Sequence, residues 1–220
     1  MKVKICGITN LEDAQVAVEA GADYLGFIFY PPSKRFVDIN IGKEIVSYLR
    51  KNGNCPVLVG VFVNETAVHM ADVLDQVGLD LAQLSGEEVP AMIGDENSPL
   101  YGRSFKALQP TSLAEAEADA EWYIPPAPHP QAPSLLLDSY HPTLRGGTGK
   151  TGNWEMSAQL AEKFLGIMLA GGLHADNVAE AVRQVRPYAV DVASGVEASP
   201  GRKDHDLVRR FIQNAKSAAP

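Results

Sequence analysis

The sequence predicts an α/β fold, a TIM (β/α)8 barrel built as one domain from residues 1–220. Eight short β-type runs alternate with helix-length amphipathic segments from one end of the chain to the other. Most of the β-type runs are apolar throughout, which is typical of strands buried on both faces. Eight successive βα units with right-handed crossovers close more readily into a barrel than into an open sheet.

The predicted strands end where apolar side chains give way to polar or glycine-rich residues. They span Val3–Cys6, Tyr24–Phe29, Val57–Val63, Leu81–Leu84, Ser104–Ala107, Leu135–Leu137, Ile167–Ala170 and Ala189–Val192. The predicted helices repeat apolar residues at intervals of three and four. They include Leu11–Ala20, Ile41–Lys51, Thr66–Val77, Leu113–Ala120, Asn177–Val185 and Asp204–Ala215. Gly21 and Gly78 follow two of these helices and suit a left-handed C-cap.

Composition and charge exclude several classes of protein. The 220 residues are 45% hydrophobic and 21% charged, which is enough for one sizeable core. A formal net charge of -8 argues against nucleic acid as a partner, because binding to the phosphate backbone needs clustered Lys and Arg. The polar start of the chain offers no signal-peptide core, and no apolar run reaches the roughly 18 residues of a membrane helix. We therefore expect a cytoplasmic protein with no membrane partner.

Cysteine and histidine usage predicts neither a metal site nor a bound cofactor. Cys6 and Cys55 are the only cysteines, and they form neither a disulfide framework nor a Cys-x-x-Cys cluster. The five histidines show no ligand spacing. The tripeptide Gly149-Lys150-Thr151 is similar to the end of a nucleotide-binding P-loop, but the first glycine of that motif falls at Leu144, which excludes an NTPase.

A thiol and a carboxyl group are the catalytic candidates, because a parallel barrel presents catalytic groups at the carboxyl ends of its strands. Cys6 closes the first predicted strand, and we expect the positive end of the following helix to favour its thiolate. The alternative for Cys6 is a small buried hydrophobe. Asp138 follows the run Leu135–Leu137, whose apolar side chains suit a protonated general acid. The alternative for Asp138 is a side chain that braces its loop.

The remaining candidates lie in loops that follow strands. Arg35 lies after the second strand, where a guanidinium can hold a substrate carboxylate with two hydrogen bonds, unless it is only a solvated surface charge. Three glycine-bearing loops follow the last three strands, and their bare backbone N–H groups suit a phosphate, although glycine also occurs in ordinary turns. The phosphate-binding candidates are Gly147, Gly149, Gly171, Gly172, Ser194 and Gly195.

Seven stretches of the chain together resemble one enzyme family. They are Lys4-Ile5-Cys6-Gly7-Ile8-Thr9, Ser33-Lys34-Arg35, Val61-Phe62-Val63-Asn64, Leu136-Leu137-Asp138-Ser139, Gly146-Gly147-Thr148-Gly149, Leu169-Ala170-Gly171-Gly172-Leu173 and Asp191-Val192-Ala193-Ser194-Gly195-Val196-Glu197 with Lys203-Asp204. In this order, and over nearly the whole chain, they resemble phosphoribosylanthranilate isomerase, a barrel enzyme of tryptophan biosynthesis.

The resemblance implies an isomerase that needs no cofactor. The reaction would be an Amadori rearrangement of N-(5'-phosphoribosyl)anthranilate to 1-(2-carboxyphenylamino)-1-deoxyribulose 5-phosphate. Asp138 would protonate the furanose ring oxygen, and the Cys6 thiolate would remove the C2 proton. Arg35 would hold the anthranilate carboxylate, Asp191 would face the substrate, and the glycine loops would hold the phosphate.

Four positions depart from the pattern of the family. Lys34 stands in place of the proline of Ser-Pro-Arg, and Ser85 in place of the histidine of Gln-Leu-His-Gly. Gly152 stands in place of the phenylalanine of Gly-Thr-Gly-x-x-Phe-Asp-Trp, and Ala193 in place of the first serine of Ser-Ser-Gly. None of these is the predicted acid or base. We therefore expect activity to be kept, with weaker substrate binding as the cost.

Two other kinds of function stay open on the sequence alone. One is another phosphosugar isomerase barrel, of which the histidine-pathway type would carry an aspartate where Cys6 stands. The other is a non-catalytic barrel that binds a phosphorylated ligand. For the isomerase that the resemblance implies, the partner is a small phosphosugar-anthranilate substrate, and the pattern fits a monomer or a homodimer.

Overall fold

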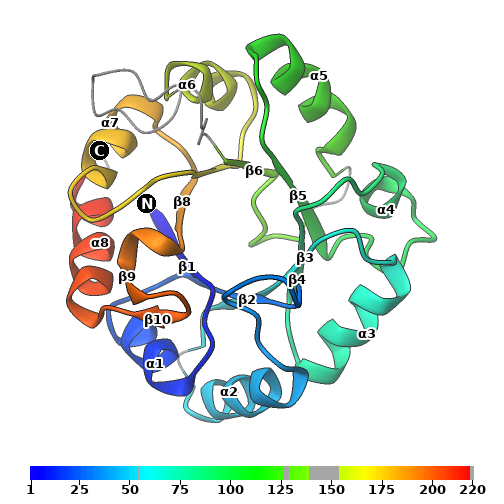
Figure 1. The fold of residues 1–220 in the computed structure, drawn as a ribbon. Coiled ribbons are helices and arrows are strands. Elements are labelled where there is room, and N and C mark those ends of the chain that lie inside the picture. Colours follow the sequence, from blue (N-terminus) through cyan, green and yellow to red (C-terminus); the bar gives the residue numbers. More distant parts are fainter. Residues whose placement is uncertain (54, 126–128, 139–153, 219–220) are drawn as a thin grey trace.

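The computed structural model describes residues 1–53, 55–125, 129–138 and 154–218, which form a closed barrel ringed by helices (Figure 1). Eight parallel strands follow one another around the barrel in chain order, and the last pairs with the first. They are β1 (Lys2–Cys6), β2 (Tyr24–Ile28), β3 (Val57–Phe62), β4 (Leu81–Leu84), β5 (Ser104–Leu108), β6 (Leu135–Asp138), β7 (Ile167–Ala170) and β8 (Ala189–Val192). The TIM-barrel prediction is confirmed.

The helices lie outside the strands and cover their outer faces. They are α1 (Leu11–Glu19), α2 (Ile39–Lys51), α3 (Ala67–Val77), α4 (Ala91–Gly94), α5 (Leu113–Tyr123), α6 (Trp154–Lys163), α7 (Val178–Val185) and α8 (His205–Ser217). Gly78 ends α3 with φ at 85°, the left-handed conformation that its residue type favours. The helices α4 and α6 are absent from the segments that the sequence predicts.

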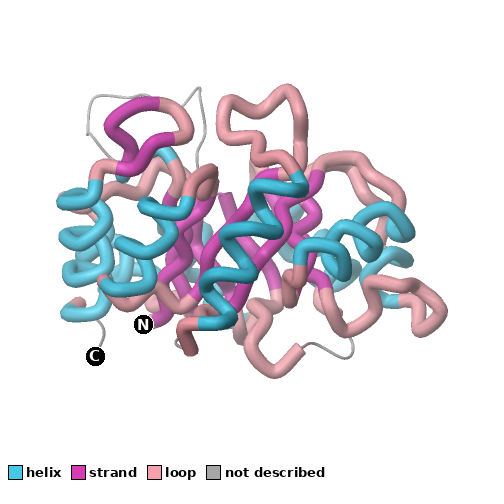
Figure 2. The backbone as a smooth tube through the Cα atoms, turned by 90° about the horizontal axis from the view of Figure 1, so that it is seen from below, coloured by secondary structure: helices cyan, strands magenta, loops and turns pink. Residues whose placement is uncertain are grey.

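A short hairpin follows β8 and was also not predicted. It begins with a single 3-10 turn, η1 (Ser194–Val196), and continues as the antiparallel strands β9 (Glu197–Ser199) and β10 (Arg202–Lys203). Figure 2 shows this hairpin at the end of the barrel opposite the N-terminus of the chain. That end carries the carboxyl termini of the parallel strands, where barrel enzymes place their active sites.

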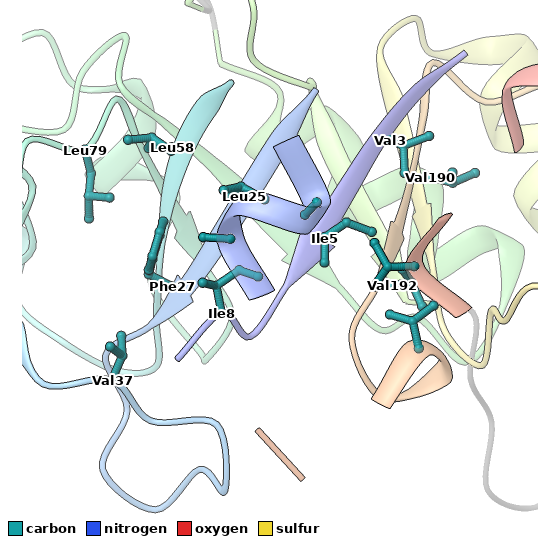
Figure 3. Packing of buried hydrophobic residues seen from close by; sticks show 14 of the residues in the cluster. Val3, Ile5, Ile8, Leu25, Phe27, Val37, Leu58, Leu79, Val190 and Val192 are labelled. Carbon is teal, nitrogen blue, oxygen red and sulfur yellow. The ribbon is translucent and has the colours of Figure 1, made fainter. Parts of the chain in front are cut away.

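The alternation of side chains along each strand divides the apolar core into two layers. Outward-facing side chains of β1, β2 and β8 pack beneath the helices, as Figure 3 shows for Val3, Ile5, Leu25, Phe27, Val190 and Val192. The inward faces fill the barrel with Tyr24, Val59, Leu81, Phe105, Leu136 and Met168. On β1 the residues that alternate with Val3 and Ile5 are Lys4 and Cys6, so a lysine and a thiol share the inward face.

Within the described part of the chain, every helix is too short or too polar to cross a membrane.

Candidate active site

The predicted acid and most of the predicted phosphate loops line one cavity of about 140 Å³ at the carboxyl end of the barrel. Its walls are Asp138, Ala170, Gly171, Gly172, Leu173, Asp191, Val192, Ala193, Ser194 and Gly195. The cavity therefore joins the end of β6 to the loops that follow β7 and β8. The candidates Gly147 and Gly149, like Gly152 among the departures, lie outside the described residues.

The two described glycine loops pack against each other through backbone atoms. Gly171 and Gly172 have φ at 94° and 64°, the left-handed region that glycine adopts without strain. A Cβ on Gly195 would lie 1.9 Å from the carbonyl oxygen of Leu173, so only a glycine fits at this contact. The Asn177 amide donates to the Gly172 carbonyl at 3.0 Å, which ties the first loop to the start of α7. These contacts keep bare backbone along one wall of the cavity.

Cys6 lies at the carboxyl end of β1, where it is 5% exposed. Its neighbour on β2 is Gly26, and the two residues are partners in the strand register. A Cβ on Gly26 would lie 2.7 Å from the Cys6 sulfur, so the missing side chain leaves room for the thiol. The backbone N–H groups of Gly7 and Ile8 both donate to the Gly26 carbonyl at 2.9 Å, which fixes the turn that follows Cys6.

A buried ion pair links the β1 residue next to the thiol with the predicted substrate residue on β8. The Lys4 ammonium donates to the Asp191 carboxylate at 3.0 Å and to the Gln83 side-chain oxygen at 2.9 Å. The Lys4 side chain is fully buried. The Gln83 amide in turn donates to the Ser85 hydroxyl at 3.1 Å. One of the four departures, Ser85, thus orients a residue that holds Lys4.

Burial and three charged neighbours act on the Cys6 thiol. Burial raises the pKa of the Cys6 thiol, while the ammonium groups of Lys4 and Lys203 lower it and the Asp191 carboxylate raises it. Burial is the largest of these influences, and the pKa of the thiol lies above its usual value. The following helix, α1, is capped by its own Asn10 side chain, and the groups that favour the thiolate are the two lysines.

The second strand and the hairpin are joined by a charged cluster above Cys6. Arg35 donates from Nε and Nη2 to the two oxygens of Glu197, both at 2.7 Å. The Lys203 ammonium donates to Glu197 at 3.2 Å, to the Cys6 carbonyl at 2.7 Å and to the Ala193 carbonyl at 3.0 Å. The hairpin therefore fastens the ends of β1 and β8 to the loop that carries Arg35.

The orientation of Arg35 leaves part of its guanidinium facing outward. Glu197 takes the Nε edge, and Nη1 has no hydrogen-bond partner among the residues that the structure describes. The Arg35 side chain is 24% exposed, whereas that of Glu197 is only 5% exposed. The edge formed by Nη1 and Nη2 is thus available for a carboxylate of a ligand.

Four charged or polar residues of the site were not among the predicted ones: Lys4, Gln83, Glu197 and Lys203. The only sequence signal for Lys4 is its place two residues before Cys6, which puts both side chains on one face of β1. Across the described ranges, no group of three or more His, Cys, Asp or Glu side chains is arranged to bind a metal ion.

Comparison with known proteins decides the family of this barrel. A sequence model described as "N-(5'phosphoribosyl)anthranilate (PRA) isomerase" matches residues 3–214. The chain belongs to this family. A relative named N-(5'-phosphoribosyl)anthranilate isomerase, from Trichlorobacter lovleyi, is 46% identical over 218 residues, which is 99% of each chain. The resemblance found in the sequence is confirmed.

Solved structures of phosphoribosylanthranilate isomerases share the fold over almost the full length. The enzyme of Thermotoga maritima superposes with a TM-score of 0.84 at 41% identity, covering 99% of both chains. A second structure, with a TM-score of 0.81 at 38% identity and the same coverage, holds reduced 1-(o-carboxyphenylamino)-1-deoxyribulose 5-phosphate. A third, with a TM-score of 0.81 at 39% identity, describes monomers generated from the dimeric Thermotoga maritima enzyme and also covers 99% of both chains.

Proposed function

We propose that this phosphoribosylanthranilate isomerase converts N-(5'-phosphoribosyl)anthranilate to 1-(2-carboxyphenylamino)-1-deoxyribulose 5-phosphate with Asp138 as general acid and Cys6 as general base. The observation that carries the assignment is the shared cavity, which places Asp138 and Asp191 beside the backbone of two glycine loops. Cys6 is not one of the residues that line this cavity, but Lys4, on the same face of β1, donates a hydrogen bond to Asp191, which does line it. A base and an acid from different strand ends can then act on one sugar.

The reaction divides into two proton transfers. Asp138 gives a proton to the furanose ring oxygen as the bond between C1 and that oxygen breaks, and the nitrogen lone pair of the substrate forms the C1–N double bond. The Cys6 thiolate then takes the C2 proton, and the electrons of that C–H bond form the C1–C2 double bond while the nitrogen regains its lone pair. Tautomerisation of the resulting enolamine to the ketone is redox-neutral within the substrate, so the sequence of steps balances without an added oxidant.

The other predicted residues bind the two ends of the substrate. The outward edge of Arg35 suits the anthranilate carboxylate, since Glu197 fixes the opposite edge of the guanidinium. Gly171, Gly172, Ser194 and Gly195 surround the part of the cavity that suits the phosphate. The roles of Gly147 and Gly149 stay predictions.

The cellular setting and the extent of the domain belong to the same proposal. Cys6 and Cys55 are both free thiols, which is typical of a reducing compartment and supports a cytoplasmic location. The family match from residue 3 to residue 214 supports a single domain over residues 1–220. A monomer and a homodimer both remain predictions for the oligomeric state.

Steady-state kinetics of two conservative variants test the proposed roles. In a fluorescence assay of substrate consumption, Asp138→Asn and Cys6→Ser should each lower kcat by about 10² to 10⁴, with a much smaller change in KM. The matched control is Cys55→Ser, which changes the other cysteine and should leave kcat unaltered. Full activity in either active-site variant would remove that residue from the mechanism. A pure wild-type protein without turnover would favour the non-catalytic phosphate-binding barrel.

A further inference from the structure

The buried ammonium of Lys4 takes no part in the proposed proton transfers, but it lies beside Cys6, the proposed base. Lys4 is fully buried on the inward face of β1. Burying a charge is costly unless it is paired and hydrogen-bonded, and Lys4 has both kinds of support. Asp191 and Gln83 accept two hydrogen bonds from it, at 3.0 and 2.9 Å. A charge held this firmly has a fixed position relative to its neighbours.

The packing around Gly26 shows how close this lysine lies to the thiol. A Cβ on Gly26 would lie 2.7 Å from the Cys6 sulfur and 3.2 Å from the Lys4 side-chain carbon Cε. The sulfur and the end of the lysine chain therefore share the space that a side chain on β2 would fill. Cε carries the ammonium group, so the positive charge is one bond away from this shared space.

We propose that Lys4 is a positioning residue for the Cys6 base: its ammonium, anchored by Asp191 and Gln83, holds a fixed positive charge beside the sulfur and favours ionisation of the thiol against the effect of burial. This inference rests on the proposed role of Cys6. The physical reason is that an opposite charge at short range favours the ionised form of a thiol, which is the form that accepts a proton from carbon. Burial alone would keep the thiol neutral and inactive as a base.

Three other charged residues face Cys6, and their positions make Lys4 the distinctive one. Asp191, on β8, disfavours the thiolate. Lys203, on β10, also favours it, though less than Lys4 does, and its ammonium donates to two carbonyls and to Glu197. Arg35 lies above Gly7 in the loop after β2 and is likewise paired with Glu197. The strand neighbour of Cys6 on β2 is Gly26, which carries no charge. The charge of Lys4 is the largest single influence that opposes the burial of the thiol.

Alkylation of Cys6 over a pH series tests the proposal without using turnover. Every protein carries Cys55→Ser, and mass spectrometry follows the reaction of Cys6 with iodoacetamide. The midpoint of the rate profile reports ionisation of the thiol, and the plateau at high pH reports its accessibility. In Lys4→Met the midpoint should rise by about 1 to 3 pH units, so that alkylation at neutral pH slows by at least about tenfold. In Asp191→Asn the midpoint should fall, because the substitution removes a negative charge that disfavours the thiolate.

The matched control is another buried, ion-paired lysine. Lys106 on β5 is paired with Glu88 at 2.7 Å, and both side chains are at most 4% exposed. Because Phe105 faces the barrel interior, its neighbour Lys106 points to the outer face. Lys106→Met should therefore leave the midpoint of Cys6 unchanged, although it removes a buried charge of the same kind.

The outcomes separate this inference from the proposed function. A Lys4→Met profile with the midpoint of the parent protein would overturn the inference, even if turnover fell. If Lys4→Met does not fold, the neutral double variant Lys4→Met with Asp191→Asn replaces it. Its midpoint should then lie above that of Asp191→Asn alone, and equal midpoints would overturn the inference. Full turnover in Cys6→Ser would instead refute the catalytic role of Cys6, while the alkylation profile would still report on Lys4.

Discussion

Replacing Gly195 with alanine tests whether the loops after β7 and β8 must touch for the enzyme to bind its substrate. A Cβ at this position would lie 1.9 Å from the Leu173 carbonyl oxygen, whereas ordinary contact begins at 3.4 Å. The two loops must therefore separate by the difference of 1.5 Å between these distances. Since a misplacement of about 1 Å can cost about 100-fold in rate, we expect kcat/KM to fall by about 100-fold or more.

Most of this loss should appear in KM, because the loops are proposed to hold the phosphate. Fluorescence kinetics with N-(5'-phosphoribosyl)anthranilate measure it, and inhibition by inorganic phosphate should weaken in parallel. The matched control is Gly94→Ala at the end of α4, where a Cβ meets nothing within 4 Å. Parent values of kcat and KM in Gly195→Ala would refute the reasoning. So would a loss of thermal stability with no change in KM.

Three further predictions concern charged side chains. Arg35→Ala should raise KM for the anthranilate substrate more than it lowers kcat, and an unchanged KM would contradict the carboxylate clamp. Burial raises the pKa of Glu197, but pairing with Arg35 brings it below the usual value. Its contribution to stability is therefore complete above an unfolded pKa of about 4.3 and is lost as the pH falls through the lower folded value. Glu197→Gln should make urea unfolding less dependent on pH in that acid range, and an identical dependence would count against the pairing. Glu88→Ala should lower the free energy of unfolding by about 3 to 5 kcal/mol, because it leaves Lys106 buried without its partner. By contrast, Glu117→Ala, which breaks an exposed pair, should change it by less than about 1 kcal/mol, and equal losses would disprove the distinction.

The barrel strands could be predicted because both of their faces are buried. Strand β7 is a short apolar run, and β8 is apolar apart from Asp191; the predicted bounds of both agree with the structure at both ends. The helix α4 has only four residues, fewer than a helical repeat needs to become visible. The hairpin strands β9 and β10 have only three and two residues, and all of these except Ala198 are polar. They therefore lack the apolar pattern on which such a prediction depends.

The residues of the site also divide into those that a local sequence pattern reveals and those that it does not. Cys6 and Asp138 could be recognised because each closes an apolar run, the place where barrels present catalytic groups. Lys4 could not, because a lysine in a strand is normally solvated, and only the closed barrel brings Asp191 beside it. The bond between Arg35 and Glu197 joins residues 162 positions apart, a separation that no local pattern spans.

The hairpin after β8 also sets the order in which the site is completed. Lys203 donates to the carbonyl of Cys6, and the Thr9 hydroxyl donates to the carbonyl of Gly201 at 2.5 Å. During synthesis on the ribosome Cys6 and Thr9 emerge long before Gly201 and Lys203, since chains are made from the amino-terminal end. A nascent chain that ends before the hairpin therefore contains Cys6 without the two hairpin residues that hold the end of β1. The complete site can form only after the hairpin has been translated, so chains truncated before it should be inactive.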